Sequence, residues 1–224
     1  MRVALLTNPQ TKEEVTQIIN SSGNEIVQCL SISRPFSEKA LQKEQNFYES
    51  FCKSSDIVIS YCYPKKILIE KLRAPCVNFH PAPLPKYKGF AVYNFAILNE
   101  EKEWAVSLHH VSDKIDEGEI IDTRNVKINI EKETALSLRQ KSHKVMKEYL
   151  KDFCEDIETF LKKNTKENGA GKYYSKKMFE SARIVDLDQE NEMDILKKIR
   201  AFWCPPYEGV VIRLHGQKYA LTKI

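Results

Sequence analysis

Apolar and polar stretches alternate along the first eighty residues with the lengths of strands and helices. Four apolar runs predict buried β-strands, at Val3–Leu6, Glu25–Ile32, Asp56–Tyr61 and Cys76–Phe79. The more polar stretches between them predict helices, after Thr11, over Lys39–Lys53 and over Lys65–Lys71. Strands that alternate with helices indicate an α/β fold, in which helices cover both faces of a parallel sheet.

The first of these helices has a start signal and an apolar face. Thr11 and Glu14 stand at the spacing of a capping box, in which side chains and backbone amides pair reciprocally. Val15, Ile18 and Ile19 follow at the three- to four-residue period of a helix. We therefore expect this helix to begin at Thr11 and to turn those three side chains toward the core.

The middle of the chain predicts two strands followed by one long helix. Val106–Val111 and Arg124–Ile130 are the strands, and they are separated by the polar segment 112–119, SDKIDEGE. Thr134 is a suitable N-cap for a helix that runs to about Lys163. Its apolar positions are spaced by three and four, as in a stripe that faces the core: Met146, Leu150, Phe153, Ile157, Phe160 and Leu161.

A polar, glycine-bearing stretch at Asn164–Lys172 predicts a linker between a core, residues 1–163, and a C-terminal extension, residues 164–224. The extension should hold a short helix and a β-hairpin, at Met193–Ala201, Val210–Leu214 and Lys218–Leu221, with the turn at 215–217. The core lacks the G-x-G-x-x-G fingerprint of dinucleotide-binding folds and the P-loop motif. The predicted fold is a Rossmann-like core with a mostly parallel sheet and a small β-rich extension.

Charge and composition exclude several classes of protein. The formal net charge is +4, of which the core contributes +1 (24 basic against 23 acidic residues) and the extension +3 (11 against 8). This mildly basic tail falls well short of a nucleic-acid-binding arm, so a nucleic-acid partner is not expected. The start of the chain lacks the pattern of a signal peptide, and no apolar run reaches the ~20 residues of a membrane-spanning helix. We expect a cytoplasmic protein with no membrane partner.

The cysteines give no sign of a metal site or a disulfide framework. None forms a C-x-x-C pair, and none has a histidine at the spacing of metal ligands. Buried, reduced thiols are the simplest interpretation of all six: Cys29, Cys52, Cys62, Cys76, Cys154 and Cys204.

Candidate chemistry lies at the end of the fourth predicted strand. Asn78 and His80 are two residues apart, so in a strand they point to the same side, and a proline-rich loop follows them. An amide and an imidazole together can donate hydrogen bonds to a developing oxyanion. The segment 112–119 adds Asp113, Asp116 and Glu117 near Gly118, which permits a tight turn. By residue type alone a structural histidine is the more common case, and the prolines can serve only to rigidify a surface loop.

The order of residues in these two segments adds a resemblance. The stretch 78–89, NFHPAPLPKYKG, resembles the hallmark loop of the formyltransferase family. That family includes glycinamide ribonucleotide transformylases, methionyl-tRNA formyltransferases and sugar N-formyltransferases. The segment 107–121, an S-x-H-x-V strand followed by D-x-x-D-x-G-x-I-I, is also similar to the family. The chain departs from the family pattern at two places, Ala105-Val106 before that strand and Phe90–Tyr93 after the loop. These departures bear on the identity of the acceptor more than on the reaction.

The resemblance implies a reaction and its residues. Asn78, His80 and Asp116 would be the catalytic trio, 10-formyltetrahydrofolate the formyl donor, and no metal would be needed. Asp116 would orient His80 and favour its imidazolium form. His109 would be a supporting residue or a packed strand histidine, His110 would face away, and His143 and His215 would lie at the surface. The folate-binding positions would be Tyr63, Lys65, Ile67, Leu84, Pro85, Asp113 and Ile115.

The acceptor is suggested by the tail, Ile199–Gly209, which is similar to that of sugar N-formyltransferases. The preferred acceptor is a nucleotide-linked amino sugar, such as dTDP-4-amino-4,6-dideoxyglucose, made for surface polysaccharide such as O-antigen. Methionyl-tRNA, a formyl hydrolase and a binding module without catalysis remain as alternatives. Aromatic rings of the tail would stack on the nucleotide base. Alternatively, they would pack the tail onto the core or across a homodimer contact. The assigned substrate positions are Lys86, Tyr93, Trp203 and Tyr207, and Phe202 is a further candidate for stacking.

Overall fold

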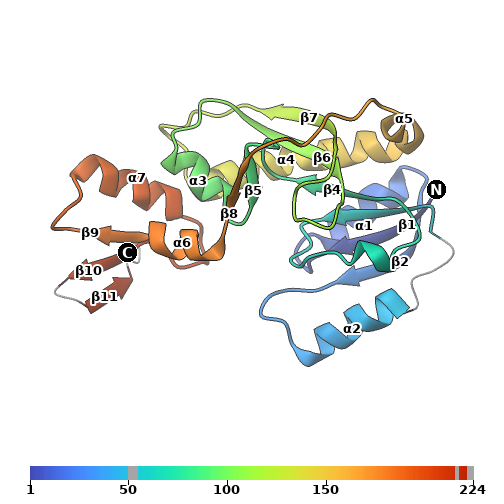
Figure 1. The fold of residues 1–224 in the computed structure, drawn as a ribbon, viewed down its shortest axis with the longest axis horizontal. Coiled ribbons are helices and arrows are strands. Elements are labelled where there is room, and N and C mark those ends of the chain that lie inside the picture. The colour runs from blue at the N-terminus through green and yellow to red at the C-terminus, as the bar shows by residue number, and fades with distance from the viewer. Residues whose placement is uncertain (50–54, 215–216, 221–224) are drawn as a thin grey trace.

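The computed structural model describes residues 1–49, 55–214 and 217–220. Six strands form the central sheet: β1 (Arg2–Thr7), β2 (Glu25–Ser31), β3 (Ile57–Tyr61), β4 (Cys76–His80), β6 (Trp104–His110) and β7 (Ile120–Val126). Their order is β2-β1-β3-β4-β6-β7 (Figure 1). The first four are parallel, whereas β6 and β7 join beyond β4 as antiparallel strands. The predicted α/β fold with a mostly parallel sheet is confirmed.

Helices cover both faces of this sheet: α1 (Lys12–Ser21), α2 (Glu38–Glu49), α3 (Val92–Leu98), α4 (Ala135–Glu155) and α5 (Ile157–Leu161). Successive residues of a strand point to opposite faces. Val3 and Leu5 of β1 therefore join the core that α1 and α4 cover, and Ala4 and Leu6 join the core that α2 covers. This arrangement leaves the carboxyl ends of β3 and β4 open, next to the turn that links β6 to β7.

Two helix starts were predicted and both are confirmed, but only one of them has a side-chain cap. Thr134 caps α4 as expected, since its hydroxyl accepts a hydrogen bond from the backbone N–H of Ser137 in a capping box. Thr11 is the N-cap of α1 but makes no such bond, because its hydroxyl pairs with Thr7 and Asn8. The Asn8 carboxamide oxygen accepts hydrogen bonds from the backbone N–H groups of Gln10 and Thr11, at 2.9 and 3.0 Å.

Three other elements differ from the prediction in their bounds. The helix predicted over Lys65–Lys71 is a single 3-10 turn, Ile69–Lys71. The strand predicted at Arg124–Ile130 begins earlier, at Ile120, because Ile120 and Ile121 are both buried. The long helix is interrupted at Asp156, whose φ of −148° is not helical and whose carboxylate caps α5.

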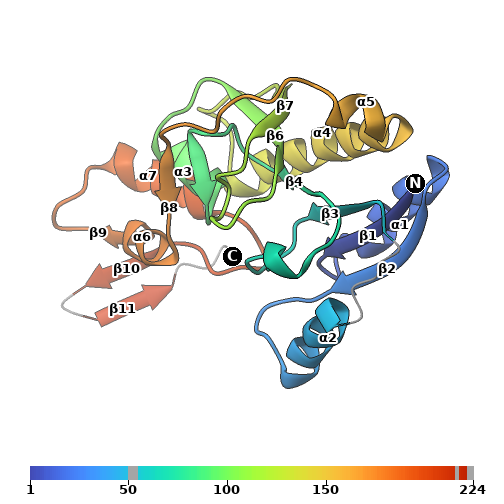
Figure 2. The ribbon, with the colours of Figure 1, turned by 45° about the vertical axis from the view of Figure 1, so that its right-hand side comes forward.

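The extension lies beside the core, next to α3, in both views (Figures 1 and 2). Its elements are β8 (Lys172–Tyr174), α6 (Lys176–Ala182), β9 (Ile184–Asp186), α7 (Glu192–Phe202), β10 (Val211–Leu214) and β11 (Gln217–Ala220). The last two strands and β9 form a three-stranded sheet. The predicted linker is tied to the core, because Lys166 bridges to Ile120 and β8 pairs with β5 (Tyr87–Gly89). The division at residue 164 stays a prediction, and the turn residues 215 and 216 lie outside the described residues.

Several single residues sit differently from the prediction. Of the described cysteines, all of which are free thiols, Cys76 and Cys154 are buried but Cys29 is exposed; Cys52 lies outside the described residues. His143 was predicted at the surface but is half-buried, because it lies between the rings of Tyr61 and Tyr93 with centroids 6.5 and 6.4 Å away. Within the described part of the chain, no helix has both the length and the apolar composition to cross a membrane.

Candidate active site

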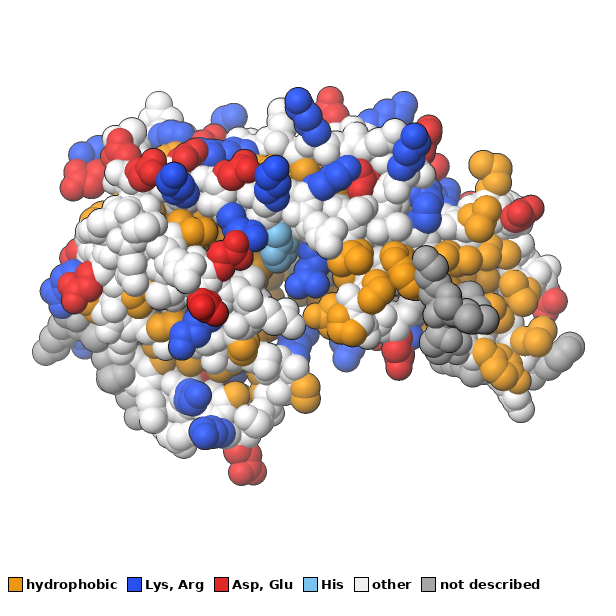
Figure 3. All heavy atoms as spheres, turned by 180° about the vertical axis from the view of Figure 1, so that it is seen from behind, with side chains coloured by type: hydrophobic (Ala, Val, Ile, Leu, Met, Phe, Trp, Pro, Cys, Tyr) orange, Lys and Arg blue, Asp and Glu red, His pale blue; other side chains and the backbone are white. Residues whose placement is uncertain are grey.

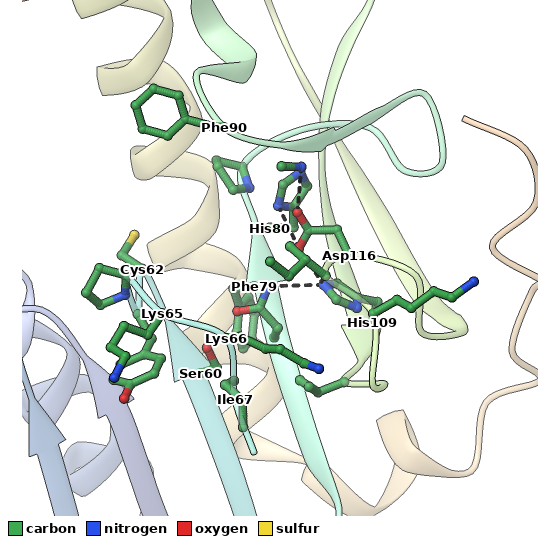
Figure 4. Close-up of a pocket in the computed structure, with 18 of the residues that line it drawn as sticks. Ser60, Cys62, Lys65, Lys66, Ile67, Phe79, His80, Phe90, His109 and Asp116 are labelled. Carbon is green, nitrogen blue, oxygen red and sulfur yellow. Dashed lines mark hydrogen bonds and ion pairs between the residues drawn. The ribbon is translucent and has the colours of Figure 1, made fainter. Parts of the chain in front are cut away.

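A hollow of about 350 Å³ opens at the carboxyl ends of β3 and β4, facing the turn that follows β6. Loops at the carboxyl ends of parallel strands are the usual ligand-binding place of open α/β sheets. Asn78, His80 and Asp116 all line this hollow, and His109 lines it beside them. Figure 4 shows the carboxylate of Asp116 pointing toward the rings of His80 and His109. The structure thus brings together polar groups from two segments that are thirty residues apart.

Asn78 is held by a chain of hydrogen bonds that fixes its amide. Nδ1 of His109 lies 2.7 Å from the carbonyl oxygen of His110, so it is the protonated nitrogen of that ring. Nε2 of His109 must then accept, and it receives the Nδ2–H group of Asn78 at 3.0 Å. This leaves the second N–H of the Asn78 amide free to donate into the hollow.

His80 presents one ring nitrogen to the hollow. Its Nε2 lies 2.8 Å from the backbone carbonyl oxygen of Tyr87, which only a protonated nitrogen can satisfy. Nδ1 is therefore the nitrogen that exchanges protons, and it lies 3.5 Å from Oδ1 of Asp116. That separation is long for a hydrogen bond, so Nδ1 remains able to reach a ligand.

Asp116 sits at the centre of the polar groups. Oδ2 accepts a hydrogen bond from the backbone N–H of Gly89 at 2.8 Å. Oδ1 faces both imidazoles, 3.5 Å from Nδ1 of His80 and 3.7 Å from Nε2 of His109. The Asp116 side chain is only 10% exposed, so this carboxylate interacts with its neighbours through little intervening water.

The environment of His109 keeps that ring neutral. Burial lowers its pKa to about 4, although the nearby Asp116 carboxylate acts in the opposite direction. A neutral ring is what the hydrogen bonds require, because Nε2 accepts from Asn78. The structure thus gives His109 a supporting place, and His110, the next residue of β6, is only half-buried.

A pH dependence of stability follows from this buried ring. The unfolded chain binds a proton at histidine below its ordinary pKa of 6.5, whereas folded His109 binds one only near pH 4. The unfolded state binds more protons between these values, so the free energy of unfolding should fall as pH drops from 6.5 to 4, by roughly 3 kcal/mol from this residue. Denaturant unfolding of wild type and His109→Gln at several pH values measures it. Equal pH slopes for the two proteins would contradict the assignment.

The predicted folate-binding residues are only partly gathered at the hollow. Tyr63, Lys65, Ile67 and Ile115 line it, as predicted from their positions. Leu84 is buried, Asp113 is exposed on the turn, and Pro85 lines a second, separate hollow of about 380 Å³. None of these positions tests the roles assigned to them, which stay predictions.

The predicted acceptor-binding residues lie elsewhere among the described residues. Lys86 lines the second hollow and pairs with Glu101. Tyr93 has its hydroxyl buried, and Tyr207 is 57% exposed on the extension. Trp203 is also on the extension and is absent from the described lining of the first hollow, whereas Phe202 is buried in the core and is not available for stacking.

Other side chains line the first hollow that the sequence analysis did not single out. Phe90 and Tyr173 are aromatic, and they are 38% and 48% exposed. Arg34, Lys66 and Lys114 add positive charge, while Asp116 is the one carboxylate among the described lining residues. Figure 4 shows Phe90 on the side of the hollow away from His109. The position of Phe90 directly after the proline-rich loop could have indicated that it lies at the site. No feature of the sequence pointed to Tyr173 or Arg34.

A nucleophilic cysteine finds little support at this site. Burial raises the pKa of the Cys62 thiol to about 12, so near neutral pH it lacks the thiolate that a nucleophilic cysteine needs. Among the described residues, no three His, Cys, Asp or Glu side chains are grouped so that they could hold a metal ion.

Comparison with known proteins adds the family. A family model described as formyl transferase matches residues 2–153. A methionyl-tRNA formyltransferase of Pseudothermotoga lettingae is 32% identical over 158 residues, which are 70% of this chain and 50% of that protein. The chain spans between 14% and 57% of the length of the first four curated relatives that it matches.

Solved structures show that the fold is shared over the whole chain. A 4-N formyltransferase of Francisella tularensis superposes with a TM-score of 0.79 at 22% identity, over 99% of this chain and 96% of that one. An N-formyltransferase of Helicobacter canadensis, solved with folinic acid and dTDP-3-aminofucose, has a TM-score of 0.74 at 20% identity, over 96% and 85%. The shared fold therefore includes the extension.

Proposed function

Because the chain belongs to the formyl transferase family, we propose that it transfers the formyl group of 10-formyltetrahydrofolate to a primary amine. The observation that carries the proposal is the convergence of Asn78, His80 and Asp116 on one hollow at the end of the parallel strands. Two hydrogen-bond donors and one carboxylate are the groups that an acyl transfer from a folate to an amine requires.

The geometry assigns a step to each group. The neutral amine attacks the formyl carbon, and negative charge develops on the formyl oxygen. The free N–H of Asn78 and the Nδ1–H of His80 stabilise that charge, and one such preorganised donor is commonly worth about 3 kcal/mol of the barrier. Asp116 accepts the proton that the amine loses. The C–N10 bond then breaks as Nδ1 of His80 gives its proton to N10 of tetrahydrofolate, the formamide is released, and the proton held by Asp116 returns to His80.

A folate donor is supported by the hollow and by one structural neighbour. The Helicobacter canadensis enzyme was solved with folinic acid, a formylated folate. In this chain the hollow combines apolar side chains, such as Ile67 and Ile115, with the cations Arg34, Lys66 and Lys114. A flat pterin suits the apolar part, and the carboxylates of a folate tail suit the cations.

For the acceptor we propose a nucleotide-linked amino sugar, such as dTDP-4-amino-4,6-dideoxyglucose, for surface polysaccharide such as O-antigen. Support comes from the likeness of fold, which includes the extension and extends to a structure that holds dTDP-3-aminofucose. Phe90 and Tyr173 offer exposed aromatic rings at the hollow, and such rings can stack on a nucleotide base. Methionyl-tRNA is the second candidate, since the sequence relatives include methionyl-tRNA formyltransferases.

The acceptor is tested by a panel that contains both classes of amine. Purified protein and 10-formyltetrahydrofolate are incubated with dTDP-, UDP- and GDP-linked amino sugars, or with charged tRNA, and each product is weighed by mass spectrometry. We expect one formyl group to be added to a nucleotide-linked amino sugar. Formylation of methionyl-tRNA alone would overturn the acceptor, and donor turnover without any amine would indicate hydrolysis instead of transfer.

We also propose that the extension forms a homodimer contact. Apolar side chains gather on the extension on the face shown in Figure 3. A surface of this kind commonly marks a protein interface. The large exposed apolar side chains of the extension include Leu187, Met193, Leu196, Tyr207, Leu214 and Tyr219. Light scattering of the purified protein should give twice the monomer mass, and Met193→Lys should lower it; a monomer at all concentrations would refute the contact.

A further inference from the structure

The turn that carries Asp116 has an unfavourable backbone conformation. Asp116 has a φ of +56°, in the left-handed region that residues with a Cβ seldom adopt. Two residues later, a Cβ added to Gly118 would lie 1.7 Å from the carbonyl oxygen of His110. The turn is therefore pressed against the end of β6, and its conformation must be supported by contacts from outside.

One side chain from the strap, which we define as residues 164–174, supplies such contacts. Nδ2 of Asn168 donates hydrogen bonds to the carbonyl oxygens of Asp116 and Gly118, at 2.9 and 2.8 Å. Both amide hydrogens are thereby used on the two ends of one turn. The orientation of the amide is unambiguous, because its oxygen could not face two carbonyl oxygens.

The strap itself is anchored on both sides of Asn168. Before it, the backbones of Lys166 and Ile120 exchange two hydrogen bonds, at 2.8 and 2.9 Å. After it, the buried ammonium of Lys88 donates to the carbonyl oxygen of Gly169 at 3.2 Å, and β8 pairs with β5. The strap is thus fixed to β7 before Asn168 and to β5 after it, and β5 also carries the Gly89 N–H that binds Asp116.

These contacts also determine where the carboxylate of Asp116 lies. Oδ2 of Asp116 is bound to the N–H of Gly89 in β5, while the backbone of Asp116 is bound to Asn168. These two attachments place Oδ1 between His80 and His109. Without the second attachment the turn can relax toward ordinary φ values, which would move Oδ1 away from both rings.

We propose that Asn168 is a positioning residue for Asp116, so that a side chain of the segment leading to the extension sets the geometry of the reaction centre. The proposal rests on the role of Asp116 in the proposed function. Its chemical requirement is a group that donates twice. Aspartate has nearly the same shape as asparagine, but its two carboxylate oxygens only accept hydrogen bonds and would face two carbonyl oxygens. Alanine has no side-chain group that can form these hydrogen bonds.

Three variants test the proposal: Asn168→Asp, Asn168→Ala and, as a matched control, Thr165→Ala. Thr165 lies in the same strap, and its hydroxyl donates to the exposed carboxylate of Glu119 and not to the backbone of the Asp116 turn. We expect kcat for formyl transfer to fall by about 10²-fold in both Asn168 variants, the size expected for a displacement of about 1 Å. KM for the donor should stay within about threefold, and Thr165→Ala should match wild type.

Hydrogen exchange of the 112–121 peptide gives a readout that needs no acceptor. We expect faster exchange there in both Asn168 variants, while the midpoint of thermal unfolding changes little. Faster exchange in a protein that formylates no amine would refute the proposed function but keep the positioning role. Normal kcat and unchanged exchange in Asn168→Asp would overturn the positioning role, as would a loss of kcat that follows global unfolding alone.

Discussion

Replacing His80 by alanine should lower kcat about a thousandfold, within the range of removing a general acid or base. His80 is placed to bring a mobile proton, at Nδ1, to the centre of the site, because its Nε2–H is held by the carbonyl of Tyr87. KM for the folate donor should change only a few-fold, since Asn78 and the rest of the hollow remain. Tetrahydrofolate release under saturating donor and acceptor measures the effect.

His110→Ala is the matched control for this variant. His110 is the neighbour of His109 on β6, is half-buried and does not line the hollow. We expect it to retain near-normal kcat. Circular dichroism of both variants would show that they fold. If the His80 variant released tetrahydrofolate at a rate near that of wild type, the proposed proton transfer and oxyanion contact would both be wrong.

Asp116→Asn should be nearly as severe, with kcat lower by about 10²- to 10³-fold. The amide oxygen can keep the hydrogen bond from Gly89, which turns the N–H₂ group toward Nδ1 of His80. That group would donate to Nδ1 and hold His80 as the neutral tautomer without a proton there. The variant therefore keeps the shape of the site but removes both the proton acceptor and the mobile proton.

Glu117→Gln provides the comparison, because Glu117 is the next residue of the same turn. It is more exposed and pairs with Lys114 at 3.6 Å. Loss of that carboxylate should leave kcat within about twofold, since exposed ion pairs contribute little. Equal effects of Asp116→Asn and Glu117→Gln on kcat would show that general negative charge on the turn matters, and not the geometry of Asp116.

The sheet was predictable because its strands are short, apolar and separated by helical stretches. Elements set by tertiary contacts were not. Thr11 makes no side-chain cap because its hydroxyl is engaged by Thr7 and Asn8 instead, at 2.8 and 3.2 Å. The strand β5 and the helix α6 have no period of their own that marks them in the sequence. β5 exists because it pairs with β8, more than eighty residues away.

The candidate site also combines features that local sequence predicts with features that depend on tertiary contacts. Asn78 and His80 share a strand, so their common direction follows from strand geometry. Their approach to Asp116 depends on a turn with positive φ and on Asn168, and neither can be read from local spacing. Trp203 and Tyr207 looked suited to stacking by residue type, yet Phe90 and Tyr173 are the exposed rings at the hollow. Exposure of an aromatic ring is a property of the folded chain.

The central claim is that Asn78, His80 and Asp116 surround one formyl carbonyl, and a crystal structure with a stable donor analogue that keeps the formyl group on N10 tests it most directly. We predict the pterin in the hollow at the ends of β3 and β4, with the formyl oxygen within about 3 Å of Nδ2 of Asn78 or Nδ1 of His80. A formyl group that points away from these three side chains, or a folate bound in the second hollow beside Lys86, would contradict the account.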